Sequence, residues 1–353
     1  MDLDALVISG WSVVSPYGMG AGPFRDGLRA GRDGTSAGPY GPFERAGVVP
    51  DFDVARVLGR KGTRSMDRVT GLTVATVGRL LDAYLPRPFE DAERVGLVLG
   101  TGSGSVQSIM DFTRDALTGE RPYHVDPARF PNTVMNRAAG QSAIWYGLKG
   151  PNTTVAGGAL TGLLALSYTA RLHRGGGCDA ILCGAAEEIS EQRARLEWHA
   201  NGPGGGPLGE GCAMFLTERL DTARRNGRAP LAVVRAVRFG AFGAPASAGE
   251  ALRRCVEDAL KDAGAPDDVR LVAPAGGPFS DHESAAIGAA LGGRRPPEVR
   301  GRPLIGDTSA ASAAFQLAAV LAAGMDDGLA LVTSIDREGT VGCALLGQPG
   351  AGT

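Results

Sequence analysis

The chain has 353 residues and a formal net charge of −2, from 36 basic and 38 acidic side chains. This length suits one large domain or two fused halves, and the balanced charge excludes strong attraction to nucleic acid or to an anionic membrane. Glycine is frequent, at 54 residues, which indicates tight turns and close backbone packing rather than disorder.

The cysteines and the first residues favour a cytoplasmic protein. The N-terminal sequence MDLDALVISG lacks the basic region of a signal peptide. The Ala-rich run from Ala310 is too short for a confident membrane span. The five cysteines are scattered, with no pair at metal-binding spacing; they are Cys178, Cys183, Cys212, Cys255 and Cys343. We therefore expect no metal, no cofactor and no membrane or nucleic-acid partner.

Short apolar runs alternate with Ala- and Leu-rich helical patterns along the chain. The clearest runs begin at Leu6, Val95, Ala180 and Ala330. Continuous apolar runs are typical of strands that helices cover on both faces. The sequence therefore predicts an α/β fold.

The pattern also has two similar halves. An Ala-rich helix expected from Thr161 has a counterpart expected over 309–323, and each is followed by a late strand. The polar, turn-rich segment TARRNGRAP begins at Thr222 and is the candidate boundary. The prediction is an N-terminal half of residues 1–222 and a C-terminal half of residues 223–353.

The segment NTTVAGGALTGLLAL, from Asn152, predicts a strand, a tight turn and the start of a helix. In many enzymes this geometry presents a nucleophile. Here the turn holds Gly157, Gly158, Ala159 and Leu160, and none of these side chains can attack a substrate.

Six stretches, in order along the chain, resemble landmarks of the β-ketoacyl synthase family, which has the thiolase fold. They are VISGWSVVSPYG from Val7, VLGTGSGSV from Val98, FPNTVMNRAAGQSAIWYGLKGPNTTV from Phe130, CDAILCGAAEE from Cys178, GEGCAMFL from Gly209 and LVTSIDREGTVGCALLG from Leu331. The resemblance spans nearly the whole chain. It implies layers in the order αβαβα, built from two pseudo-duplicated halves.

The resemblance also implies three catalytic positions, and this chain has a different residue at each. The family's nucleophilic Cys, whose pKa the helix N-terminus lowers, corresponds to Ala159. Its two His residues assist decarboxylation of a malonyl unit and stabilise the developing charge; they correspond to Ala275 and Asp307. The family's gating turn is here Asp336–Gly339. Because a methyl group cannot take on an acyl chain, we expect a non-catalytic member.

Members without these groups resemble the chain length factor, the partner of an active ketosynthase in type II polyketide synthases. The resemblance implies a heterodimer, contact with the acyl carrier protein through that complex, and a tunnel whose volume limits the polyketide. The compact sequence favours the reducing, polyene-forming kind. The residues expected at the tunnel or the interface are Ser103, Val106, Ile109, Met110, Thr113, Arg129, Phe130 and Met135.

Two of these expectations rest on simple physical arguments. Helical spacing puts Val106, Ile109 and Met110 on one face together with Thr113, and this face fits ordinary core as well as tunnel lining. Arg129 lies in the segment that crosses the family's dimer interface. A charge buried there is costly without a partner, so we expect a carboxylate or carbonyl on the other subunit.

Other functions stay open. One is a self-sufficient acyltransferase with relocated chemistry at Cys178 or His282, which needs a nucleophile and a base within about 3 Å of each other. Another is a structural homodimer without catalysis. Asp307 also fits a plain capping role at the front of the helix that follows it.

Overall fold

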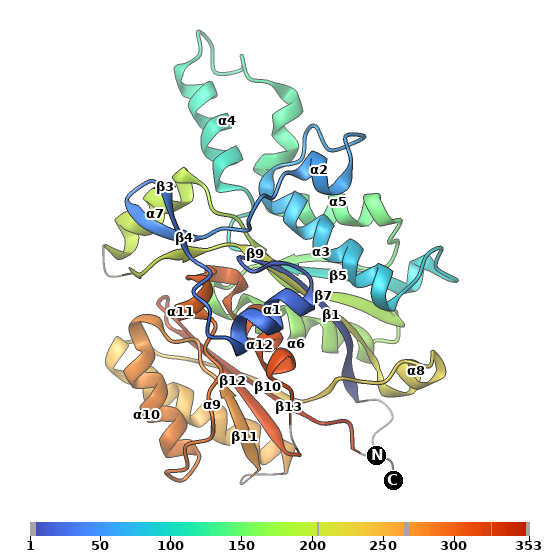
Figure 1. The fold of residues 1–353 in the computed structure, drawn as a ribbon, viewed down its shortest axis with the longest axis vertical. Coiled ribbons are helices and arrows are strands. Elements are labelled where there is room, and N and C mark those ends of the chain that lie inside the picture. The colour runs from blue at the N-terminus through green and yellow to red at the C-terminus, as the bar shows by residue number, and fades with distance from the viewer. Residues whose placement is uncertain (1–4, 203–204, 265–267, 326, 351–353) are drawn as a thin grey trace.

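The computed structural model describes residues 5–202, 205–264, 268–325 and 327–350. Its centre is a mixed sheet in the order β11-β12-β13-β10-β1-β9-β7-β5-β6, with β2 paired to β1 at the side (Figure 1). The strands are β1 Leu6–Ser15, β2 Gly18–Met19, β5 Val95–Gly100, β6 Asn152–Val155, β7 Ala180–Glu187, β9 Gly211–Arg219, β10 Ala232–Ala241, β11 Val269–Ala273, β12 Leu329–Asp336 and β13 Thr340–Gly347. The four apolar runs singled out in the sequence are all strands.

The sheet consists of two parts that meet at a short seam between β1 and β10. Two residue pairs join these strands, Val7 with Val233 and Ile8 with Ala232. On one side of the seam, β5 pairs in parallel with β6 and β7, and β9 is antiparallel to β7 and β1. On the other side, β11 pairs in parallel with β12, and β13 is antiparallel to β12 and β10. Strand β6 is at one end of the order.

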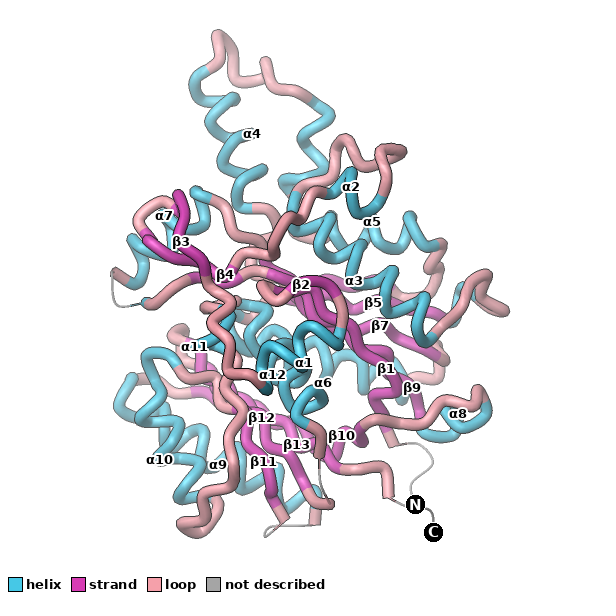
Figure 2. Tube along the Cα trace, viewed as in Figure 1, coloured by secondary structure: helices cyan, strands magenta, loops and turns pink. Residues whose placement is uncertain are grey.

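Helices cover both faces of each part, as the continuous apolar runs predict (Figure 2). The helices are α1 Ala21–Arg29, α2 Val54–Leu58, α3 Arg68–Tyr84, α4 Val106–Thr118, α5 Arg137–Tyr146, α6 Thr161–Arg174, α7 Glu191–Asn201, α8 Leu220–Arg225, α9 Ala248–Ala263, α10 Ser280–Ala290, α11 Arg302–Ile305 and α12 Ser312–Ala323. Helices α3 and α5 lie outside the first part of the sheet, and α9 and α10 lie outside the second. Helices α6 and α12 pack between the two parts.

Alternate residues along the inner strands point into different cores. In β5, Leu97 and Leu99 join the cluster under α3 and α5, while Val98 joins the central cluster with α6 and α12. In β13, Cys343 and Leu345 join the cluster under α9 and α10, while Ala344 and Leu346 join the central cluster. These strands therefore separate two apolar layers, and the predicted αβαβα order is confirmed.

Two smaller features lie near one end of the molecule. A short sheet joins β3 Ser36–Tyr40, β4 Phe43–Gly47 and β8 Leu208–Gly209. Residues 106–135, which we call the arm, contain α4 and the 3-10 turn η2 Pro127–Thr133, and α4 projects from the body in Figure 1. Helix α4 has no fully buried residue.

The predicted helix over 309–323 begins later than expected. Its first residues form a 3-10 turn, η7 Ser309–Ala311, and the α-helix starts at Ser312. Ser309 has φ 47, a left-handed conformation that no α-helix of L-residues can include. The predicted boundary after residue 222 lies within α8 and stays a prediction. Within the described ranges, no helix is long and apolar enough to cross a membrane.

Candidate functional site

The predicted strand, turn and helix around Ala159 are present. Strand β6 leads into a 3-10 turn, η3 Gly158–Leu160, and α6 follows directly. Gly158 has φ 54, which a residue without a side chain adopts at little cost. The Thr161 hydroxyl donates to the Gly158 carbonyl at 2.7 Å and accepts from the Gly157 N–H at 3.0 Å. These bonds fix a turn that carries the Ala159 methyl group in front of α6.

A carboxylate from the other part of the sheet lies on this turn. Asp336, the last residue of β12, accepts a hydrogen bond from the Ala159 N–H at 2.7 Å through Oδ2. Its Oδ1 accepts from the Glu338 N–H at 2.8 Å. The sequence identified 336–339 as the counterpart of a gating turn but did not predict this contact, because 177 residues separate the two partners. The signal was a carboxylate in the segment that the sequence identified as the counterpart of the gating turn.

Ala275 lies just after β11 and has a buried acidic neighbour. Glu283 of α10 accepts from the backbone N–H groups of Ala275 and Gly276, at 2.9 and 2.8 Å, and from the Thr333 hydroxyl at 2.7 Å. Burial raises the pKa of Glu283, while these hydrogen bonds oppose the shift. The carboxyl group thus holds the loop that carries Ala275, and sequence reasoning did not single it out.

Asp307 is engaged by its own surroundings. Its Oδ1 accepts from the Ser309 N–H at 2.9 Å, and its Oδ2 accepts from the Arg302 guanidinium at 2.6 Å. The first bond satisfies the backbone N–H of the first residue of η7. The N-cap residue of η7 is Thr308, however, and that of α12 is Ala311, so Asp307 supports the front of this segment without being the N-cap weighed in the sequence.

These three positions line one open pocket of about 530 Å³ between the two parts of the sheet. Ser103, from the predicted tunnel set, lines it too. Charged side chains from several elements complete its wall: Glu197, Arg302, Asp336, Arg337 and Glu338. Among the described residues that line the pocket, there is no Cys and no His. The structure thus brings Ala159, Ala275 and Asp307 together and adds charged groups that the sequence did not predict.

The other predicted tunnel or interface residues all lie on the arm. Val106 and Ile109 are half-buried, whereas Met110 and Thr113 are more open to solvent, Met110 being 40% exposed. The apolar face of α4 is therefore not buried in a core of this chain. On the return of the arm, the ring of Phe130 lies 6.1 Å from that of Phe112 but remains 57% exposed.

Met135 is 38% exposed and completes the predicted set. Seven of the ten exposed large apolar side chains of the described residues lie between positions 110 and 144. They are Met110, Leu117, Tyr123, Phe130, Val134, Met135 and Ile144. Exposed apolar side chains are thus concentrated in this stretch of the chain, which is the kind of surface that interaction sites present.

Arg129 pairs within its own chain. Its guanidinium lies 3.1 Å from Asp115 and 3.9 Å from Asp126. The side chain is about half-exposed in the single chain, so these ion pairs lie close to solvent. A further carboxylate or carbonyl partner on another subunit stays a prediction.

The alternative nucleophile and base are poorly suited to catalysis. Cys178 is 2% exposed, and burial raises the pKa of its thiol, which keeps it protonated and shielded. His282 is exposed on the first turn of α10, with its ring 6.0 Å from that of Phe279. Within the described residues, no group of three or more His, Cys, Asp or Glu could hold a metal ion.

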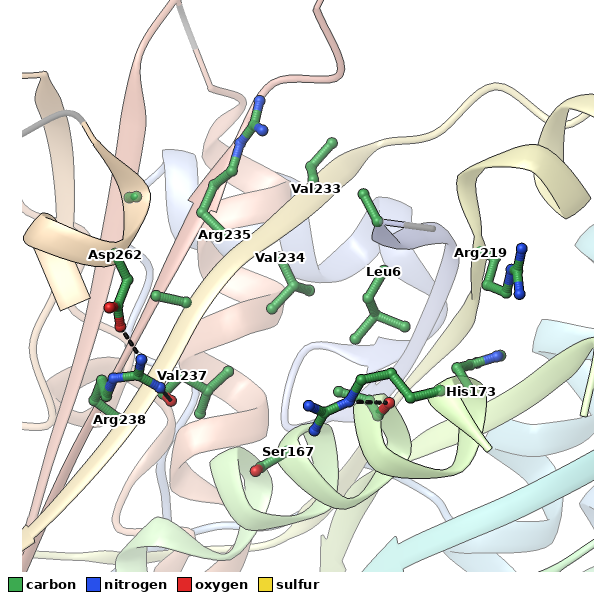
Figure 3. A pocket seen from close by; sticks show the side chains of 15 residues that line it. Leu6, Ser167, His173, Arg219, Val233, Val234, Arg235, Val237, Arg238 and Asp262 are labelled. Carbon is green, nitrogen blue, oxygen red and sulfur yellow. Dashed lines mark hydrogen bonds and ion pairs between the residues drawn. The ribbon is translucent and has the colours of Figure 1, made fainter. Parts of the chain in front are cut away.

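A second pocket, of about 580 Å³, lies between the last turns of α6 and strand β10 (Figure 3). Valine side chains of β10 and Leu6 line it, and arginines, including Arg174 and Arg238, stand around it. Burial lowers the pKa of His173, also in its lining, to about 4, so this His is neutral near pH 7. The pocket is at the opposite end of α6 from Ala159, and the chemistry implied by the resemblance lies elsewhere.

The layered fold, with a strand–turn–helix at a pocket between two sheet parts, is that of the thiolase-like ketosynthases. The chain belongs to the β-ketoacyl synthase family: residues 4–223 match the model described as "Beta-ketoacyl synthase, N-terminal domain". Among curated relatives, the 3-oxoacyl-[acyl-carrier-protein] synthase 2 of Coxiella burnetii is 29% identical over 306 residues, which are 77% of this chain and 73% of that protein.

Two solved structures extend the likeness. The ishigamide ketosynthase/chain length factor is 39% identical, with a TM-score of 0.89 over 98% of this chain and 100% of that chain. A type II polyketide synthase acyl-carrier protein in complex with its ketosynthase, bound to the hexaketide, matches with a TM-score of 0.81, over 98% of this chain and 99% of that chain. Its 19% identity supports the fold alone.

Proposed function

We propose that this chain is a non-catalytic chain length factor that pairs with an active ketosynthase in a type II polyketide synthase. One observation carries the proposal. The three positions that correspond to the family's catalytic side chains line one pocket, and they hold Ala159, Ala275 and Asp307. No thiol or imidazole belongs to the described lining of that pocket, so the groups by which the family accepts and activates an acyl chain are missing from it.

The exposed apolar side chains of the arm and of helix α5 support a partner protein. Ile144, on α5, is 77% exposed. The Asn152 side chain of β6 donates to the Ala139 carbonyl of α5 at 3.1 Å, so this helix lies against an end strand of the sheet. An unpaired strand edge beside apolar side chains is a favourable place for another chain to bind. The 39% identity to a ketosynthase/chain length factor favours a ketosynthase as that partner.

The arm is also our candidate for the tunnel. Ile109 and Met110 lie next to each other on α4, one half-buried and the other exposed, where a partner would complete an enclosed volume. An acyl chain that reaches such a wall cannot extend without steric cost. We propose that the product is a polyene of limited length, that the carrier protein is met through the complex, and that residues 1–222 and 223–353 form the two pseudo-duplicated halves.

Co-expression with a ketosynthase that retains Cys and both His tests the pairing. The two chains are expected to elute together and to bury well over about 1,000 Å². Condensation is expected from the pair, and incubation of this chain alone with malonyl- and acyl-carrier protein is expected to leave its intact mass unchanged. An acyl adduct on this chain, or turnover by it without a second protein, would falsify the proposal.

Product length tests the tunnel separately. In the active pair, Ile109→Ala and Met110→Ala are expected to lengthen the polyketide, because each removes volume from the wall. Gln107→Ala is the matched control, since this side chain donates to Asp111 at 2.7 Å on the other side of α4. Unchanged products from the first two variants would remove α4 from the tunnel.

A further inference from the structure

The Asp336 carboxylate lies on the turn where a catalytic family member would bind its acyl group. It accepts the Ala159 N–H at 2.7 Å, and the turn of residues 336–338 holds it in place through the Glu338 N–H. Asp336 ends β12, in one part of the sheet, and Ala159 follows β6, in the other part. The hydrogen bond between them therefore spans the pocket that both residues line. It is therefore a feature of the folded chain rather than of a local turn.

The shape of the turn fits the carboxylate closely. A Cβ atom added at Gly158 would overlap the Asp336 carboxyl group. Gly158 also has a left-handed φ of 54, which disfavours other residues. The Asp336 carboxylate, a hydrogen-bond acceptor from the same chain, thus fills the space next to the turn.

The backbone around the Ala159 N–H is suited to binding a negatively charged group. The Ala159 N–H precedes the 14-residue helix α6, whose N-terminal end carries partial positive charge. In acyl transfer, a backbone N–H of this kind donates to the carbonyl oxygen as negative charge develops on it. A carboxylate bonded to the same N–H competes for the donor and repels the developing charge.

We propose that Asp336 closes this turn to acyl thioesters by occupying the backbone N–H that would bind their carbonyl oxygen. The inference rests on the proposed function and deepens it: the chain excludes acyl groups by occupancy and by charge, besides lacking a nucleophile. It follows that a thiol placed at position 159 does not restore acylation while Asp336 is present.

Thiol labelling tests this in the full chain. The five native cysteines are all buried, so a thiol at position 159 is the one expected to react under native conditions, with the unsubstituted chain as blank. The variants are Ala159→Cys alone, or combined with Asp336→Ala, Asp336→Asn or Glu338→Gln. Intact mass follows alkylation by iodoacetamide over time.

We expect Asp336→Ala to raise the alkylation rate of the Ala159→Cys chain at least about tenfold, because the carboxylate no longer disfavours the thiolate. Asp336→Asn keeps an acceptor of the same shape without the charge. The alkylation rate of Ala159→Cys combined with Asp336→Asn is therefore expected to lie between that of Ala159→Cys alone and that of its combination with Asp336→Ala. Glu338→Gln removes a charge from the same pocket without freeing the turn and is expected to leave the rate within about threefold of the single variant.

Acylation gives the second measurement. With an acyl N-acetylcysteamine thioester, the thiolate that Ala159→Cys introduces attacks the carbonyl, the carbon–sulfur bond of the donor breaks, and N-acetylcysteamine leaves and takes up a proton. An acyl adduct is expected when Ala159→Cys is combined with Asp336→Ala and not with Ala159→Cys alone. Equal rates with and without Asp336, or an equal effect of Glu338→Gln, would overturn the inference.

The outcomes separate this inference from the proposed function. Labelling needs no partner, whereas pairing is measured by co-elution with the ketosynthase, which Asp336→Ala is expected to leave intact. Thermal unfolding of each variant identifies any that fail to fold, and the isosteric Asp336→Asn variant then carries the comparison. Failure of labelling alone removes the role of Asp336, and an acyl adduct on the unsubstituted chain removes the proposed function.

Discussion

In the proposed pair with a ketosynthase, replacing Ile144 by Ala is expected to weaken binding while leaving this chain's own stability unchanged. Ile144 is 77% exposed on α5. Full burial of such a side chain is worth about 1.5–3 kcal/mol, so covering the exposed fraction is worth about 1–2 kcal/mol. The dissociation constant should therefore rise about 5- to 30-fold.

Titration calorimetry of the purified subunits measures this change. The control is Leu231→Ala, on the loop before β10, where the side chain is 38% exposed and lies away from the arm. This variant should leave the dissociation constant unchanged. Thermal unfolding of Ile144→Ala should match the parent, because most of that side chain is already in solvent. If Ile144→Ala binds as tightly as the parent, or if Leu231→Ala weakens binding as much, the assignment of the interface to α5 and the arm is wrong.

Three further predictions concern the chain's own stability in urea. Glu210→Gln should cost about 2–4 kcal/mol, because the buried carboxylate pairs with Arg68 through a bond of 2.8 Å; a loss below about 1 kcal/mol would contradict a structural role for the pair. Gly162→Ala should destabilise by about 1–3 kcal/mol, since a Cβ there would overlap the backbone of α12. Gly140→Ala, in a helix with open space around it, should be neutral or stabilising, and equal effects of the two would refute the packing argument. Burial, and then a neighbouring carboxylate, raise the pKa of Glu188 from 4.5 to about 7. At a pH between these two values, the folded state therefore binds more protons than the unfolded state. Stability should therefore fall by about 3 kcal/mol as the pH rises from 4.5 to about 7, relative to Glu188→Gln, and parallel pH curves for the two proteins would contradict this.

The layers of the fold could be predicted because they follow from local patterns. The run at Val95 has no polar alternation, and in the structure Val98 and Leu99 enter different cores on the two faces of β5. The turn at Ala159 could be predicted for the same reason, since small residues between a strand and a helix leave few geometries. Its meeting with Ala275 and Asp307 followed from the family resemblance, because no local pattern reports which distant loops come together.

The contacts that give the pocket its character could not be predicted. Asp336 reaches Ala159 across 177 positions of sequence, and its role depends on which oxygen meets which N–H. The spacing of apolar residues correctly predicted that α4 is a helix. It could not predict how exposed the apolar face is, because periodicity does not say whether the surface that covers this face belongs to the same chain. The pairing of Arg129 with Asp115 was missed for a related reason: the arm folds back on itself.

The charges of the central pocket bear on where a chain length factor could hold an acyl chain. Arg302 donates to Asp307 at 2.6 Å, and Asp336 accepts from the turn at 2.7 Å. An alkyl or polyene chain placed against these groups would remove water from them without offering hydrogen bonds, which costs free energy. The arm also carries ion pairs, such as that of Arg129 with Asp115, but it has apolar side chains such as Met110 exposed to solvent beside them. If this chain limits product length, we therefore expect the volume that does so to lie along α4 at the partner's surface, and not in the charged pocket at Ala159.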